Sequence, residues 1–66
     1  MLKIKVNDKT IETEITNLKK FLESKKINLE TIVVDINGKI LKPEEYSGYT
    51  LKKNDKINIF NFVGGG

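Results

Sequence analysis

The sequence contains no cysteine, no histidine and no arginine among its 66 residues. Without cysteine and histidine, the chain offers no disulfide, no thiolate-based zinc site and no cysteine or histidine that acts as a nucleophile or base. The same absence excludes a cysteine persulfide on this chain.

Long apolar runs are also missing, since none exceeds a few residues. A membrane span needs about 20 apolar residues, and the apolar part of a signal peptide needs about seven. The length predicts a single small domain, close to the size at which one core is only marginally sufficient. Together these observations predict a soluble, cytoplasmic protein without a membrane span.

Lysine provides all twelve positive charges, against nine carboxylates, and the formal net charge is +3. A surface that binds nucleic acid would be expected to carry arginine, with base-stacking aromatic residues among the cations. Here lysines cluster only beside one predicted helix and at one turn, at Lys19, Lys20, Lys25, Lys26, Lys52 and Lys53. We therefore interpret the charge as a solvated surface and exclude nucleic acid as the main partner.

Residues 2–6 and 11–15 alternate apolar and polar side chains with a period of two, which predicts two strands. The turn-forming residues between them, Asn-Asp-Lys, favour a tight hairpin. Such a hairpin gathers its apolar side chains on one face and sets Lys3 and Lys5 across from Glu12 and Glu14 on the other. Two registers fit this pattern equally well.

A short amphipathic helix is predicted over residues 18–26, where apolar side chains recur at i, i+3 and i+4. Thr16 or Asn17 can cap it. The β-branched run that follows ends at Asn37-Gly38, the strongest two-residue hairpin signal, so a short strand is expected to return. Pro43 ends that strand, and an irregular loop or single helical turn follows.

A last alternating segment, residues 56–63, runs into three glycines. The order of hairpin, helix, second hairpin, loop and final strand predicts an α+β fold, with one mixed sheet and one main helix against it. We divide the chain into a domain of residues 1–63 and a flexible glycine tail, residues 64–66. The predicted core consists of Ile4, Val6, Leu18, Phe21, Leu22, Ile57 and Ile59.

Three explanations compete for Gly64, Gly65 and Gly66: a frayed end, the remnant of an expression linker, or a reactive terminal carboxylate on Gly66. Glycine suits the last role because a tail without Cβ atoms fits a narrow channel and leaves the acyl carbon unshielded. Three extended residues reach about 10 Å. A carboxylate cannot be substituted directly, so a partner enzyme would first convert it to an acyl-adenylate with ATP and Mg²⁺.

Four segments carry a family resemblance: "IKVND" in the first hairpin, "VVDINGKILKPEEY" in the middle, "LKKNDKINI" before the last strand, and "NFVGGG" at the end. Through them the whole chain resembles the ThiS/MoaD-type sulfur carriers, which are small ubiquitin-like β-grasp proteins that end in Gly-Gly. It is most similar to the carriers of thiamine biosynthesis. The resemblance implies that the first and last strands lie parallel and side by side in the centre of the sheet.

The resemblance also implies a chemistry for the tail. A ThiF-type, E1-like adenylyltransferase adenylates Gly66, which is then converted to a thiocarboxylate, with Gly65 as its partner in the diglycine and Gly64 as an additional glycine. The sulfur comes from cysteine through a desulfurase system, and a ThiG-type thiazole synthase receives it for the thiazole ring of thiamine. The chain would then be a co-substrate without a bound cofactor or metal, and not an enzyme.

Phe60 and Phe62 have the opposite strand parity to the isoleucines of the same segment, so we expect them on the sheet face away from the helix. Val33 has the corresponding parity on its own strand. Together with Val63, these residues predict a patch for partner docking just before the tail. The alternative is local cover by a loop or by Tyr49.

Adjacent Glu44 and Glu45 point apart, and we interpret them as surface residues of a loop and not as an acid–base pair. Asp35 and Asp55 are interpreted as turn-flanking residues on the same reasoning. Three functional alternatives stay open beside the thiamine carrier. They are a carrier for molybdopterin or another sulfur-containing product, a ubiquitin-like protein modifier, and a β-grasp binding module with an inert tail.

Overall fold

The computed structural model describes residues 1–62, which form five strands, one α-helix and two short 3₁₀ helices. In chain order the elements are β1 (Leu2–Val6), β2 (Lys9–Thr13), α1 (Leu18–Ser24), η1 (Leu29–Thr31), β3 (Ile32–Ile36), β4 (Lys39–Leu41), η2 (Pro43–Gly48) and β5 (Lys56–Asn61).

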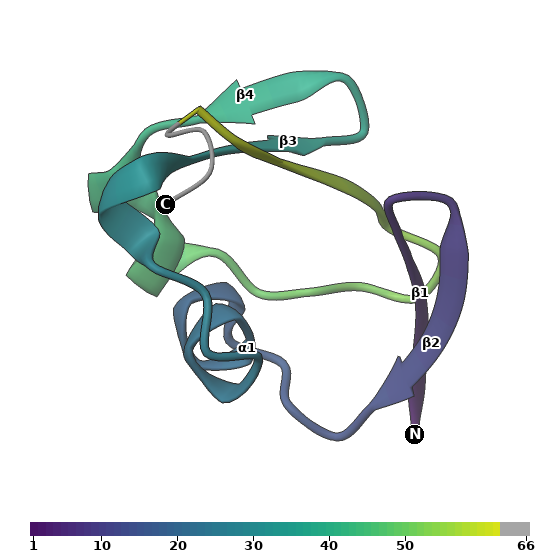
Figure 1. Cartoon of the computed structure of the whole chain (residues 1–66). Helices are drawn as coiled ribbons and strands as arrows, with labels where there is room; N and C mark the ends of the chain where they lie inside the picture. Colours follow the sequence, from purple (N-terminus) through teal and green to yellow (C-terminus); the bar gives the residue numbers. More distant parts are fainter. Residues whose placement is uncertain (63–66) are drawn as a thin grey trace.

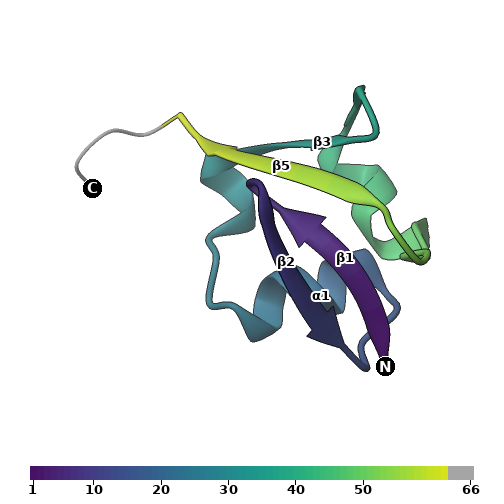
Figure 2. The same ribbon diagram turned by 90° about the vertical axis from the view of Figure 1, so that its right-hand side faces the viewer.

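The last strand lies in the centre of the sheet, whose order is β2-β1-β5-β3-β4. β5 runs parallel to β1, with Val6 beside Ile57, and antiparallel to β3. Two views at right angles show β5 between these neighbours and α1 against one face of the sheet (Figure 1, Figure 2). This is the ubiquitin-like β-grasp arrangement. The predicted α+β class and the parallel central strands are therefore confirmed.

Both hairpins turn on an asparagine in the left-handed conformation. Asn7 and Asp8 have φ angles of 49° and 69°, and Asn37 and Gly38 have φ angles of 54° and 89°. Positive φ at both central residues is the requirement of a type I′ turn, whose twist matches that of the strands. The local sequence therefore determines both hairpins.

The register of the first hairpin resolves the choice that the sequence left open. Lys3 faces Glu12, whereas Lys5 faces Thr10. The turn contains two residues instead of the predicted three, and β2 ends before Glu14. Of the two glutamates predicted across from these lysines, only Glu12 is therefore the cross-strand neighbour of one.

The helix is shorter than the predicted segment 18–26, because it ends at Ser24. Asn17 caps its N-terminus, where Oδ1 accepts a hydrogen bond of 3.0 Å from the N–H of the third helical residue. Lys26 then adopts a left-handed φ of 58°, and the N–H groups of Lys26 and Ile27 donate back to carbonyls of the helix. These two bonds form a Schellman motif, which stops the helix.

The core lies between α1, the inner face of the sheet and η2. Its buried apolar residues are Ile4, Leu18, Phe21, Leu22, Ile32, Val34, Ile36, Leu41, Tyr46, Leu51 and Ile57. Five of the seven predicted core residues are among them, while Val6 and Ile59 are only half-buried.

Val6 and Ile59 depart from the prediction because they lie beyond the end of α1. With Ile11 and Ile27 they line an open apolar groove of about 390 Å³, next to the turn between β1 and β2. A helix that stops at Ser24 does not extend over them. The strand parity of these two residues is correct, but no element within residues 1–62 covers them fully.

Tyr46 was not predicted in the core. The segment expected to be a loop or one helical turn folds as η2 and inserts Tyr46, which is 1% exposed. Its hydroxyl has no hydrogen-bond partner among residues 1–62, and burial raises its pKa. η2 therefore closes the core on the side of β4 and leaves one polar atom unsatisfied.

Candidate functional site

The outer face of β5, away from α1, carries an apolar cross-strand pair, in which Phe60 is exposed and Val33 is half-buried. Val33 and Phe60 are direct cross-strand partners in the β3–β5 ladder. Phe60 is 57% exposed, whereas Ile57 on the other face of the same strand is 1% exposed. Tyr49 does not cover the ring, because its hydroxyl donates a hydrogen bond to Asp55 instead. The structure therefore places Phe60 on the face that strand parity predicted.

Phe62 extends this apolar surface beyond the end of β5 at Asn61. The Phe62 N–H donates to the carbonyl of Thr31 at 3.0 Å, so the chain continues alongside the start of β3. The ring itself is 63% exposed. Val63, predicted in the same patch, and the glycine tail, residues 64–66, lie outside the described residues.

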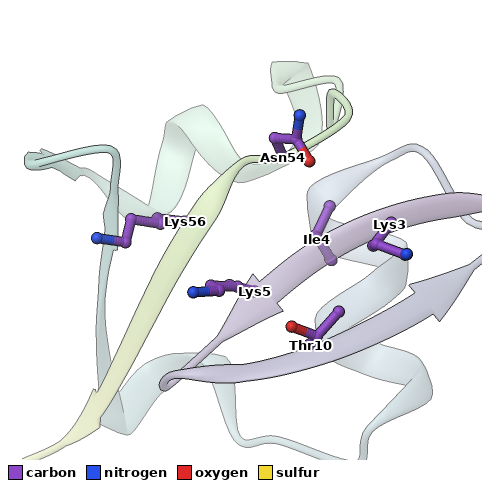
Figure 3. Close-up of a pocket in the computed structure, with 6 residues that line it drawn as sticks. All are labelled: Lys3, Ile4, Lys5, Thr10, Asn54 and Lys56. Atoms are coloured by element: carbon purple, nitrogen blue, oxygen red, sulfur yellow. The ribbon is translucent and has the colours of Figure 1, made fainter.

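Lysines gather on the other half of the outer face. Lys5 and Lys56 are partners in the parallel β1–β5 ladder, and Lys3 lies two residues before Lys5 on the same face. With Thr10 and Asn54 they line a pocket of about 290 Å³. Figure 3 shows the side chains of Lys5 and Lys56 extending to the same side of their two strands. Within residues 1–62 no carboxylate comes within ion-pair distance of these lysines, although Glu12 is the cross-strand neighbour of Lys3. Lys5 and Lys56 therefore make this half of the face positively charged.

Asp55 flanks a turn, as predicted. Its carboxylate is also buried and accepts hydrogen bonds, which the sequence interpretation missed. Asp55 is 5% exposed and accepts three hydrogen bonds of 2.9 Å, from Asn37 Nδ2, the Tyr49 hydroxyl and the Lys52 N–H. Burial opposes ionisation, yet these bonds outweigh it and hold the pKa of Asp55 below its ordinary value. Burial and the Asp55 hydrogen bond raise the pKa of Tyr49 to about 12. The network fastens the β3–β4 turn to the start of β5.

The sequence can now be placed among known proteins. The profile of the ThiS family matches residues 2–66, which is almost the whole chain. The chain belongs to the ThiS family.

Two solved structures show how far this ThiS-family fold is shared. The crystal structure of a thiamine biosynthesis protein (ThiS) from Geobacter metallireducens has a TM-score of 0.84 at 28% identity, and the match covers 98% of this chain and 100% of that one. The NMR solution structure of a thiamine biosynthesis protein from the same organism has a TM-score of 0.78 at 28% identity, and the match covers 98% of this chain and 88% of that one. A search of curated proteins gave no match.

The remaining acidic candidates of this ThiS-family chain have structural roles. The Glu45 carboxylate accepts the N–H of Lys42 at 2.8 Å and so caps η2, while Glu44 is exposed beside it. Asp35 accepts the N–H of Gly38 at 2.9 Å inside the β3–β4 turn. These contacts agree with the interpretation of Glu44, Glu45 and Asp35 as loop and turn residues.

Within residues 1–62, no three acidic side chains lie close enough together to hold a metal ion. No helix in the same range has the length and apolar character to cross a bilayer. The candidate site is the outer face of β5, with its apolar patch (Val33, Phe60 and Phe62) and its lysine group (Lys3, Lys5 and Lys56).

Proposed function

We propose that the protein is a sulfur carrier for thiamine biosynthesis and that the Gly66 carboxylate is the group that carries sulfur. A ThiF-type adenylating enzyme activates this carboxylate with ATP and Mg²⁺, and the adenylate is converted to a thiocarboxylate. A ThiG-type thiazole synthase then receives the sulfur for the thiazole ring. In this proposal the protein is a cytoplasmic co-substrate, modified by enzymes and without catalytic residues of its own.

The observation that carries the proposal is the family match, which runs through Gly66. The two solved structures described above are those of thiamine biosynthesis proteins, and each match covers nearly the full length of this chain. This supports thiamine over molybdopterin as the product that the carrier serves.

The geometry of β5 supports the same role. β5 is the central strand, held between β1 and β3, and four residues follow Phe62 in the sequence. Fully extended, four residues span about 14 Å. A reach of this size lets a terminal carboxylate enter the active site of a partner while the folded domain stays at its surface.

The proposed chemistry explains why a nucleotide is needed. A carboxylate resists substitution because its leaving group would be oxide. Attack of a Gly66 carboxylate oxygen on the α-phosphorus of ATP forms an acyl-adenylate and releases pyrophosphate. The outer sulfur of a persulfide supplied by the desulfurase system then attacks the acyl carbon, and AMP leaves. A thiol reduces the resulting acyl disulfide, which releases the thiocarboxylate, in which sulfur replaces one carboxyl oxygen. Glycine at positions 65 and 66 leaves that carbon open to attack.

The outer face of β5 is the proposed docking surface for the adenylating enzyme. Phe60 and Phe62 provide apolar rings that a complementary pocket can bury, and aromatic anchors of this kind dominate many interfaces. Lys5 and Lys56 lie on the same face. The surface that covers them is therefore expected to present carboxylates opposite the lysines.

The full chain and a chain that lacks Gly66 test the proposal in parallel. With the ThiF-type enzyme of the same genome, ATP and Mg²⁺, the full chain is expected to drive exchange between pyrophosphate and ATP. A sulfur source should then raise its mass by about 16 Da, because sulfur replaces oxygen. If the truncated chain exchanges pyrophosphate and gains this mass as well, the proposal is wrong.

Gly66→Ala separates the steric requirement from the presence of the carboxylate. A methyl group beside the acyl carbon is expected to slow pyrophosphate exchange while the melting temperature stays that of the wild type. Isopeptide-linked adducts in a cell lysate would instead identify a protein modifier, and sulfur transfer into molybdopterin would identify the related carrier.

A further inference from the structure

Asn7 joins the first hairpin to β5 at the point where β1 ends. Its backbone N–H donates to the Ile57 carbonyl at 2.9 Å, as the last bond of the parallel ladder. Its side chain continues the ladder: Oδ1 accepts the Ile59 N–H at 2.8 Å, and Nδ2 faces the Ile59 carbonyl at 3.4 Å. A primary amide offers the same acceptor and donor as a peptide group. The side chain therefore replaces the strand residue that the turn has removed.

This contact holds β5 close to its C-terminal end. On the β3 side the ladder runs to the pair Ile32–Asn61, and the Phe62 N–H then bonds to Thr31. On the β1 side the ladder pairs end at Ile57, and the Asn7 side chain extends the support to Ile59. β5 is therefore fixed from both sides as far as Ile59.

The second hairpin provides an internal comparison. Asn37 also has a positive φ, and its Oδ1 accepts the Lys56 N–H at 2.9 Å. Its Nδ2 donates to Asp55, which belongs to the turn before β5. Two asparagine side chains thus bind the backbone of the same strand at opposite ends. Asn37 binds where β5 begins, and Asn7 binds where β5 leads to Gly66.

We propose that Asn7 is a positioning residue, which fixes the backbone at Ile59 and so sets the direction in which β5 delivers the Gly66 carboxylate. The inference rests on the proposed function. Asn61 and Phe62, which follow Ile59, are held on the β3 side, so loss of the Asn7 contact leaves the end of β5 supported from one side only before the chain continues to Gly66. A misplacement of about 1 Å can lower the rate of an oriented reaction about 100-fold.

The position of Asn7 predicts which kinetic constant depends on it. Asn7 lies in the β1–β2 turn, and the proposed docking surface, with Phe60 and Phe62, lies on the outer face of the sheet. Loss of the amide is therefore expected to affect the geometry of the adenylation step and to leave the apolar docking contacts intact.

The chain offers matched variants for the test. Asn7→Gly removes the amide and tolerates the φ of 49° at this position. Asp8→Gly is the control: Asp8 lies in the same turn at φ 69°, and within residues 1–62 its carboxylate makes no hydrogen bond to β5. Asn37→Gly removes the corresponding amide at the other end of the strand.

Each full-length variant is assayed for pyrophosphate exchange with the ThiF-type enzyme, at a temperature at which circular dichroism shows it folded. Hydrogen–deuterium exchange of the Ile59 amide is followed by NMR. In Asn7→Gly we expect this amide to exchange at least about tenfold faster, kcat to fall about tenfold, and KM for the carrier to change by less than about twofold. Asp8→Gly is expected to match the wild type in all three quantities, and Asn37→Gly is expected to lose thermal stability but keep its kcat.

An unchanged kcat in Asn7→Gly, or an equal loss of kcat in Asn37→Gly, overturns the positioning role. If Asn7→Gly does not fold, Asn7→Asp replaces it; this variant keeps an acceptor for the Ile59 N–H and loses the donor. A wild-type chain that drives no pyrophosphate exchange overturns the proposed function, and the positioning role with it. In that case, faster hydrogen–deuterium exchange of the Ile59 amide in Asn7→Gly still establishes the hydrogen bond between Asn7 and Ile59.

Discussion

Val33 and Phe60 face each other across the β3–β5 ladder, on the outer face of the sheet. Figure 2 shows α1 against the other face. Phe60 remains more than half exposed in this position. A ring with this exposure contributes little to the core, but it contributes apolar contact area as soon as another surface covers it. The pair therefore marks where a docked partner gains the most from the apolar patch.

Phe60→Ala tests this relationship. Truncation of a buried interface anchor commonly costs about 2 kcal/mol or more, which lowers affinity about thirtyfold. The folded domain loses only one exposed cross-strand pair, worth at most about 1 kcal/mol. Titration calorimetry with the adenylating enzyme should show the loss of affinity, and a thermal melt should show a small change.

Ile40→Ala is the control for Phe60→Ala. Ile40 is 65% exposed on the same outer face, but it lies on β4, two strands away from β5. Its removal is expected to change affinity by less than about threefold. If the Phe60→Ala variant binds the adenylating enzyme as tightly as the wild type does, or if the variant is unfolded, the assignment of Phe60 to the docking face is wrong.

Much of this architecture could be predicted from local sequence. The period-two segments and the Asn-Asp and Asn-Gly turns determine both hairpins, because a type I′ turn depends on the turn residues themselves. Strand parity alone predicted Phe60 on the outer face, where the structure has it. The parallel pairing of β1 with β5, by contrast, joins the two ends of the chain, and it was expected only from the family resemblance.

Other features depend on tertiary contacts that no local sequence pattern indicates. An aspartate before a strand has the same sequence signature whether it is solvated or, like Asp55, buried under three hydrogen bonds. Tyr46 follows two glutamates in a polar segment and still enters the core. Asn7 is recognisable as a turn residue, but its bonds to Ile59 appear only when β5 lies beside β1.

Leu22→Ala tests the core beneath α1. Leu22 is fully buried, and removal of a buried leucine costs about 2–5 kcal/mol. A domain of this size has a total stability of about 3–10 kcal/mol, so the loss is a large part of it. Urea unfolding measures the change, with Lys20→Ala on the same helix as the control. Equal stability of both variants would contradict the placement of Leu22.

The two tyrosines of the chain are expected to respond in opposite ways to loss of the hydroxyl. The Tyr46 hydroxyl is buried without a partner among residues 1–62, so Tyr46→Phe should leave stability unchanged or raise it by about 1 kcal/mol. The Tyr49 hydroxyl donates to the Asp55 carboxylate, so Tyr49→Phe should lower stability by about 1.5 kcal/mol or more. Urea unfolding at neutral pH compares the two. A destabilised Tyr46→Phe would reveal a partner for that hydroxyl.

Asp55→Asn is expected to destabilise the domain in a pH-dependent way. The asparagine keeps one acceptor, but its NH₂ group opposes the donors from Tyr49 and Lys52, at a cost of about 2 kcal/mol near neutral pH. The pKa of Asp55 is lower in the folded state than the ordinary value of 3.8. The carboxylate therefore stabilises the fold above that value, and this contribution is lost as the pH falls through the folded-state pKa.

Urea unfolding of the wild type and Asp55→Asn at pH 7 and at several values below pH 4 measures this dependence. The gap in unfolding free energy should be constant near neutrality and should narrow as the pH falls. A gap that stays the same down to the lowest pH at which both proteins fold would show that the charge of Asp55 contributes nothing.

The lysine group predicts a salt-dependent encounter with the adenylating enzyme. Lys5 and Lys56 lie directly beside each other in the central strands, and like charges in such pairs destabilise a sheet slightly. Carboxylates on a covering surface would offset this repulsion and speed association at low ionic strength.

We expect KM for the carrier to rise with salt. A Lys5→Gln, Lys56→Gln double variant is expected to show a KM several-fold higher at low salt and a weaker dependence of KM on salt. A Lys19→Gln, Lys20→Gln double variant, which removes the same two charges on α1 behind the sheet, should behave as the wild type. If this control raises KM as much as the Lys5→Gln, Lys56→Gln variant does, net charge and not the outer face governs the encounter.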